Sequence, residues 1–150
     1  MNEKLKNIFY IFFPLIGGII ISFIINNSID YQNLIKPPLS PPSILFPIVW
    51  SIIYILMGIS FYIYKKSNNN ETTETIYYLQ LVINYFWSIF FFVFKWYFFS
   101  IIWILLLDTI IILLLLRFNK ENKISFYLNI PYIIWCIFAT YLTIGIYLLN

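Results

Sequence analysis

Five long apolar segments alternate with short polar connections along this chain of 150 residues. Each segment holds about 18 or more residues with few charges, which is enough for an α-helix to cross the hydrocarbon core of a bilayer. The pattern predicts an all-α fold, an integral membrane bundle of five transmembrane helices in a single domain over residues 1–150. The expected spans are residues 8–25, 44–64, 76–94, 98–118 and 124–149.

Composition agrees with a membrane location. Hydrophobic residues make up 62% of the chain and charged residues only 10%, whereas about 25% of a soluble domain is charged. Such a chain cannot cover itself with a water-soluble surface, so the lipid bilayer is the expected partner of its outer surface. Five spans use roughly 100 residues, which leaves room for short connections but not for a second domain.

The first apolar segment, residues 8–25, follows a short basic stretch, as a secretory signal peptide would. It is longer than a typical signal-peptide core and has no A-x-A cleavage site, so we interpret it as an uncleaved helix. Pro14 and the pair Gly17-Gly18 lie inside it. Neighbouring helices are expected to cover the backbone that these residues loosen.

The basic residues are divided unequally between the two sides of the predicted bundle. The side that carries the N-terminus holds Lys4, Lys6, Lys65, Lys66, Arg117, Lys120 and Lys123. The other side holds Lys36 and Lys95. Because lysine and arginine are enriched in cytoplasmic loops, the N-terminus is predicted to be cytoplasmic and the C-terminus outside. The net charge of +3 follows from this orientation, and no nucleic-acid partner is expected.

The chain contains no histidine and one cysteine, Cys136. This excludes an intramolecular disulfide, Ser-His-Asp and Cys-His catalysis, the usual zinc sites and the commonest haem ligand. No metal and no required cofactor are therefore predicted.

The connection between the first two spans is rich in proline, with Pro37, Pro38, Pro41 and Pro42 within six residues. Each proline fixes its own φ and biases the preceding residue towards extended geometry, so the segment is expected to be stiff. One interpretation is a lid over the mouth of the bundle; the alternative is that the prolines merely end one helix and begin the next. Pro47 is expected to kink the second helix.

Aromatic, polar and small residues recur at helical spacing in three of the spans, which places each set on one helix face. The sets are Trp50, Tyr54, Met57, Gly58 and Phe61; Gln80, Asn84, Trp87, Ser88 and Phe91; and Tyr132, Cys136, Ala139 and Thr143. Facing inward, they would line an apolar pocket for a planar aromatic ligand. The alternative is an ordinary bundle core, with polar contacts of about 0.6 kcal/mol each.

Asp108 lies near the middle of the fourth span, where a carboxylate is costly and needs a partner. A functional interpretation is proton relay or contact with a polar ligand edge. The favoured interpretation is a protonated acid bonded to Thr109 or to a neighbouring helix.

Several motifs resemble one known family. The run Leu34-x-Lys36-Pro37-x-x-x-Pro41-Pro42, followed by Phe46, Trp50, Tyr54 and Gly58, resembles the first loop and second helix of the translocator protein family, also called TspO/MBR or tryptophan-rich sensory proteins. Residues 80–88 resemble its third helix, and residues 131–142, with Leu149-Asn150, resemble its fifth. The length and the five spans match as well.

The resemblance implies a membrane receptor or sensor that binds porphyrin and similar planar hydrophobic molecules, and a possible homodimer. Some relatives also bind cholesterol and benzodiazepine-type drugs. The residues that match the family's pocket are Trp50 and Asn84, followed by Tyr54, Trp87, Tyr132, Trp135, Phe138 and Ala139. Lys36 would offer a cation to a propionate, and metal-free porphyrin is favoured because the chain lacks histidine.

The resemblance also carries two rival functions. Some relatives degrade porphyrin in light, but Ile144 and Asp30 stand where the tryptophans of those relatives are expected, so an enzymatic role is left open and not favoured. Transport of porphyrin or lipid is the other. Sterol binding is disfavoured because no basic residue follows Lys123, which leaves Tyr147 without the partner that the weak sterol pattern requires.

Overall fold

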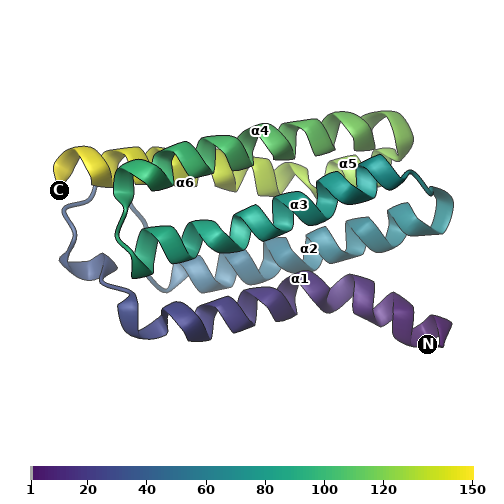
Figure 1. Ribbon diagram of the computed structural model, residues 1–150, viewed down its shortest axis with the longest axis horizontal. Coiled ribbons are helices and arrows are strands. Elements are labelled where there is room, and N and C mark those ends of the chain that lie inside the picture. Colours follow the sequence, from purple (N-terminus) through teal and green to yellow (C-terminus); the bar gives the residue numbers. More distant parts are fainter. Residues whose placement is uncertain (1) are drawn as a thin grey trace.

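The computed structural model describes residues 2–150 as a bundle of long helices that lie side by side (Figure 1). The helices are α1 (Glu3–Ile25), α2 (Leu45–Ser67), α3 (Glu71–Ser88), α4 (Tyr97–Glu121), α5 (Lys123–Leu128) and α6 (Ile130–Leu149). Short 3-10 turns, η1 (Asn26–Ser28) and η2 (Tyr31–Asn33), follow α1, and a π-helical turn, η3 (Ile89–Val93), follows α3. Five of the helical segments are long and apolar enough to cross a membrane, which confirms the predicted fold class.

Helix ends differ from the sequence prediction where side chains set them. α3 begins at Glu71, before the expected residue 76, because the Asn70 side chain accepts hydrogen bonds from the backbone of Thr72 and Thr73. The fifth span is divided into α5 and α6 at Asn129, and Pro131 lies in the first turn of α6, where its missing N–H costs nothing.

The prediction that Pro47 kinks the second helix is wrong. α2 begins at Leu45, so Pro47 also lies in a first turn, where backbone N–H groups have no partner within the helix. Unlike Pro47, Pro14 lies in the interior of its helix, and α1 is bent near its middle, close to this proline (Figure 1).

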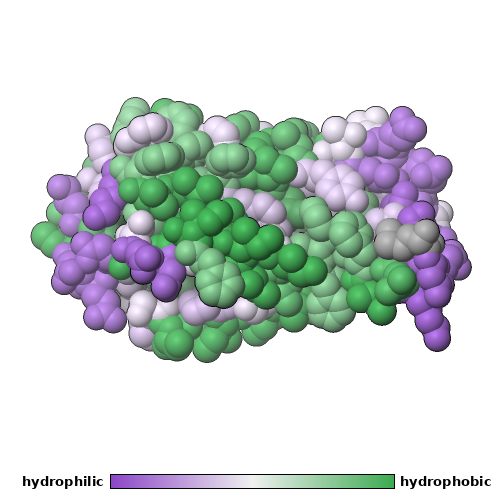
Figure 2. All heavy atoms as spheres, turned by 60° about the horizontal axis from the view of Figure 1, so that its bottom comes forward, coloured by the Kyte–Doolittle hydropathy of each residue, from purple (hydrophilic) through white to green (hydrophobic). Residues whose placement is uncertain are grey.

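Polar groups lie at the two ends of the bundle and apolar side chains form a band between them, as Figure 2 shows for one face. One end carries the N-terminal helix start, the α2–α3 connection and the α4–α5 connection. The other carries the proline-rich segment, the α3–α4 turn and Asn150. The basic residues thus lie at the ends, as a membrane-spanning bundle requires.

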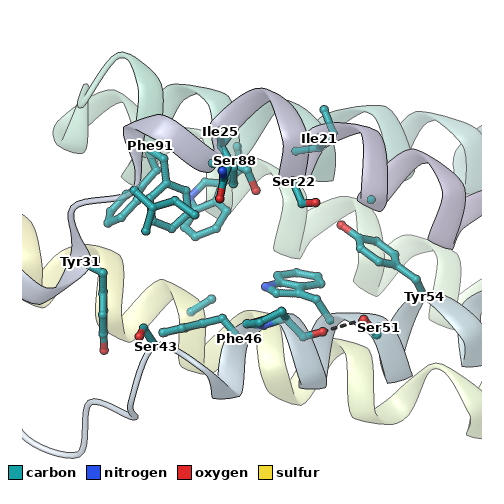
Figure 3. Close-up of a pocket in the computed structure, with 18 of the residues that line it drawn as sticks. Ile21, Ser22, Ile25, Tyr31, Ser43, Phe46, Ser51, Tyr54, Ser88 and Phe91 are labelled. Atoms are coloured by element: carbon teal, nitrogen blue, oxygen red, sulfur yellow. Dashed lines mark hydrogen bonds between the residues drawn. The ribbon is translucent and has the colours of Figure 1, made fainter.

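α1 is the most peripheral of the five spans and packs chiefly against α2. Only 11% of the most apolar 18-residue stretch of α1 is buried inside the bundle, compared with 33% to 39% of the corresponding stretches of the other spans. Gly58 allows the close approach of the two helices, since a Cβ at this position would overlap the backbone carbonyl of Ile11. The two helices are close at Gly58 and lie farther apart towards the end that carries the proline-rich segment. The candidate site lies there, between α1 and α2 (Figure 3).

Candidate ligand-binding pocket

A cavity of about 400 Å³ lies between α1, α2, α3 and α6, within the size range of small-molecule sites. Its lining is mostly apolar and aromatic. Figure 3 shows Ser88 and Phe91 on one side of this space and Ser43 and Phe46 on the opposite side, with Tyr31 at one end and Tyr54 at the other. Ser22 and Ser51, which are exposed on the outer surface, also line it, so the cavity opens between α1 and α2.

Aromatic rings make up the walls. Trp50 stacks on Tyr54 with ring centroids 5.4 Å apart, and Trp135 meets Trp50 edge to face at 6.4 Å. On the α3 side Trp87 stacks on Phe91 at 5.2 Å, and Phe92 meets Trp87 edge to face. Flat ring faces of this kind favour stacked or edge-on contact with another planar ring system.

Three of the hydroxyl groups around the cavity, those of Ser22, Ser51 and Thr143, are already used as donors within the protein. Ser22 donates to the carbonyl of Ile19, Ser51 to that of Pro47 and Thr143 to that of Ala139, each within its own helix. A ligand therefore meets their oxygens only as acceptors, in a largely apolar surface.

A buried hydrogen-bonded network supports the end of the cavity at Tyr54. The Tyr54 hydroxyl donates to Asn84 Oδ1 at 2.5 Å, and Asn84 Nδ2 donates to the Tyr132 hydroxyl at 2.9 Å. The Tyr132 hydroxyl donates in turn to Gln80 Oε1 at 2.7 Å. Because buried polar groups are costly unless paired, this network fixes Tyr54 in place from behind.

The proline-rich segment is anchored to the bundle beside the cavity. The Tyr31 hydroxyl donates to the carbonyl of Pro41 at 2.9 Å, and burial raises the pKa of this phenol, so it keeps its proton at neutral pH. The Tyr141 hydroxyl donates to the carbonyl of Pro38. Asn150 accepts from the Ile35 backbone N–H and donates to its carbonyl. These bonds hold the segment as a strap across the end of α6.

Comparison with protein-family models decides the identity of the chain. The model of the TspO/MBR family matches residues 10–149. The chain belongs to the TspO/MBR family. Membership confirms the resemblance inferred from the motifs and supports a membrane sensor or binding role in general. A search of curated proteins finds no match.

Five of the nine predicted site residues line the cavity of this TspO/MBR protein, and they come from three helices. They are Trp50 and Tyr54 on α2, Trp87 on α3, and Trp135 and Ala139 on α6. Periodicity grouped Trp50 with Tyr54 and identified the helix faces that carry Trp87 and Ala139, because residues three, four and seven apart share a face. Trp135 was predicted from the family resemblance alone.

The other four predicted residues lie elsewhere in this TspO/MBR structure. Asn84 and Tyr132 are buried behind Tyr54, in the network described above. Phe138 packs on Trp135 from outside the cavity lining, with ring centroids 5.5 Å apart.

Lys36 also does not line the cavity. Its ammonium group lies 3.0 Å from the carbonyl oxygen of Tyr31 and 3.2 Å from that of Leu34, and it sits over the Tyr31 ring. The stiff strap turns this side chain back on its own backbone, so Lys36 stabilises the strap.

The first helix contributes a wall that sequence reasoning missed. Gly18, Ile21, Ser22 and Ile25 of α1 all line the cavity. A Cβ at Gly18 would overlap the Tyr54 ring, so the glycine is needed for the two helices to share this space. The available signal was the pair of small residues four positions apart, Gly18 and Ser22, on one face of the first span.

Asp108 lies outside the cavity lining and pairs with a neighbouring helix. Its Oδ2 accepts a hydrogen bond of 2.6 Å from the Thr140 hydroxyl of α6, whereas Thr109 donates to the carbonyl of Leu105 in its own helix. The favoured interpretation from the sequence named both possible partners, and the structure selects the neighbouring helix.

Proposed function

We propose that this TspO/MBR protein is a membrane receptor or sensor that binds a porphyrin-like planar hydrophobic ligand in the cavity between α1, α2, α3 and α6. The observation that carries the proposal is the pair of aromatic walls, with Trp50 and Tyr54 on α2 and Trp87 and Phe91 on α3. A planar ring system that enters between them gains stacking on flat faces and buries apolar area without displacing a hydrogen bond.

In this proposal the ligand is free of metal or carries its own axial ligands. The chain has no histidine, and the described residues contain no group of His, Cys, Asp or Glu that could hold a metal ion. Binding therefore depends on shape and ring contact, and ligands of different chemistry but similar outline compete for the same space.

Titration of the solubilised protein with protoporphyrin tests the proposal, with the porphyrin absorption band as the readout. Trp50→Leu and Trp135→Leu should each weaken binding by about tenfold, because each removes one aromatic contact of roughly 1.4 kcal/mol. Trp96→Leu is the matched control, since Trp96 is exposed in the α3–α4 turn and does not line the cavity. Equal affinity in all three variants would contradict this site.

The same preparation separates the rival functions. Illumination of the complex should leave the porphyrin spectrum unchanged if the protein only binds, whereas a new absorbing product would indicate degradation. Proteoliposomes loaded with porphyrin should show no protein-dependent flux if the protein is a receptor, and flux would indicate transport.

A further inference from the structure

A second, smaller cavity of about 100 Å³ lies at the end of the bundle opposite the strap, between the first turns of α1 and the last turns of α2. We call it the basic cleft. Its lining residues are Glu3, Lys6, Asn7, Tyr10, Tyr62, Lys65 and Lys66. Two helices and seven side chains of polar or amphipathic character thus converge on one small space.

Most polar groups of the basic cleft are unused by the protein. Within residues 2–150 the side chains of Lys6, Asn7, Tyr10, Tyr62 and Lys66 make no hydrogen bond or ion pair. The Lys66 ammonium group lies over the Tyr62 ring, 5.4 Å from the ring centroid. Ammonium, amide and phenol groups are all hydrogen-bond donors. The cleft therefore presents several donors that a single anion could engage together.

The charge of the basic cleft is positive. Lys65 is neutralised by Glu74, with Nζ and Oε1 2.6 Å apart. Lys6 and Lys66 have no carboxylate within ion-pair distance in the described part of the chain, and Glu3 offsets one of these two charges. The cleft therefore keeps a net positive charge, which favours an anion over a cation.

The position of the basic cleft favours a lipid over a soluble anion. Phe9, three residues after Lys6 on α1, is exposed, and Phe12 and Ile16 continue the exposed apolar surface towards the middle of the bundle, so an apolar helix surface begins beside the cleft. Lys120 and Lys123 lie at the same end of the bundle and add to the field that attracts anionic lipids. A phospholipid could place its phosphate in the cleft and its acyl chains along α1.

We propose that the basic cleft is a binding site for the headgroup of an anionic phospholipid, with the phosphate oxygens accepting from Lys6, Lys66 and a tyrosine hydroxyl. Charge-assisted hydrogen bonds of this kind are stronger than neutral ones. The site lies at the far end of the bundle from the ligand pocket and does not depend on the function proposed for that pocket.

Native mass spectrometry of the purified protein, titrated with phosphatidylglycerol or phosphatidylcholine, tests the proposal. The wild-type protein should retain phosphatidylglycerol in preference to phosphatidylcholine. The double variant Lys6→Gln with Lys66→Gln should bind phosphatidylglycerol about thirtyfold more weakly, because two lysine contacts with an anionic lipid are lost. The control, Lys120→Gln with Lys123→Gln, removes the same charge from the same end outside the cleft and should retain most of the affinity.

Several outcomes would overturn the site. An equal loss in the control variant would show that the lysines act only through a diffuse field, and an unchanged affinity in the cleft variant would show that they do not touch the lipid. Displacement of the lipid by millimolar inorganic phosphate would assign the cleft to a soluble anion. If the double variant unfolds in phosphatidylcholine, Tyr62→Phe replaces it, and this variant should weaken phosphatidylglycerol binding with no change in unfolding temperature.

Discussion

Tyr54 is the residue at which the ligand pocket meets the hydrogen-bonded core. Its ring faces the cavity and stacks on Trp50, while its hydroxyl is held by Asn84. Under the proposed function, Asn84 would therefore act on a ligand through Tyr54, without touching the ligand. The distinction matters for mutagenesis, because a residue behind the wall changes stability as well as affinity.

Asn84→Leu should destabilise the protein by about 2 kcal/mol, since it leaves the buried Tyr54 hydroxyl without its acceptor and removes one of the two partners of the Tyr132 hydroxyl. Thermal unfolding in detergent measures the effect. Thr109→Val is the control, because the Thr109 hydroxyl is exposed and bonds only within its own helix. A variant with normal unfolding and a large loss of ligand affinity would show instead that Asn84 contacts the ligand directly.

Asp108→Leu should change stability by less than about 1 kcal/mol and leave porphyrin binding unchanged. The Asp108 Oδ1 atom is buried without a hydrogen-bond partner among the described residues, so the carboxyl group is costly to bury. Thr140 keeps a partner after the substitution, since its hydroxyl also contacts the carbonyl of Cys136 at 2.8 Å. Parallel unfolding and titration measurements check this, and lost binding at normal stability would assign Asp108 a role in function.

At the scale of helices, hydrophobic periodicity was enough to predict five spans and the inward faces of three of them. It did not predict the start of α3 or the break at Asn129, because these depend on side chains that bond to local backbone groups. It also missed the wall from α1. That helix is apolar on nearly all sides, so periodicity does not distinguish the face at Gly18 and Ser22 from the face towards lipid.

Gly58→Ala should destabilise the packing of α1 on α2 by about 1–3 kcal/mol, because the added methyl group overlaps a backbone carbonyl that cannot move without the whole helix. Gly17→Ala is the matched control on α1, since its methyl group would meet the Tyr85 ring and hydroxyl, and this side chain can turn aside at the cost of its bond to the Pro14 carbonyl. Unfolding temperatures should fall more for Gly58→Ala, and porphyrin affinity should fall with them as α1 moves away from the pocket. Equal effects of the two variants would contradict a backbone contact.

At the scale of the whole molecule, the distribution of basic residues predicts which end faces the cytoplasm. The end with the N-terminus and the α2–α3 connection carries seven of the nine basic residues, and the strap lies at the other end. The ligand pocket lies nearer the strap, so this orientation places it nearer the outer surface of the membrane.

Cysteine labelling in intact cells tests that orientation. A membrane-impermeant thiol reagent should label Gln32→Cys, which is exposed beside the strap, and should label Asn69→Cys, in the α2–α3 connection, only after the cells are opened. The native Cys136 is buried and gives little background. The reverse pattern would invert the topology without affecting the fold.

α1 supplies one side of the pocket, yet most of its surface faces outward and its contacts inside the bundle are mainly with α2. The free energy of holding that side in place therefore includes the interaction of α1 with acyl chains, which varies with bilayer thickness and composition. An affinity measured in a detergent micelle and one measured in a native-like bilayer consequently describe two different arrangements of the pocket. Ligand rankings from different laboratories can be compared only when the same amphiphile surrounds α1.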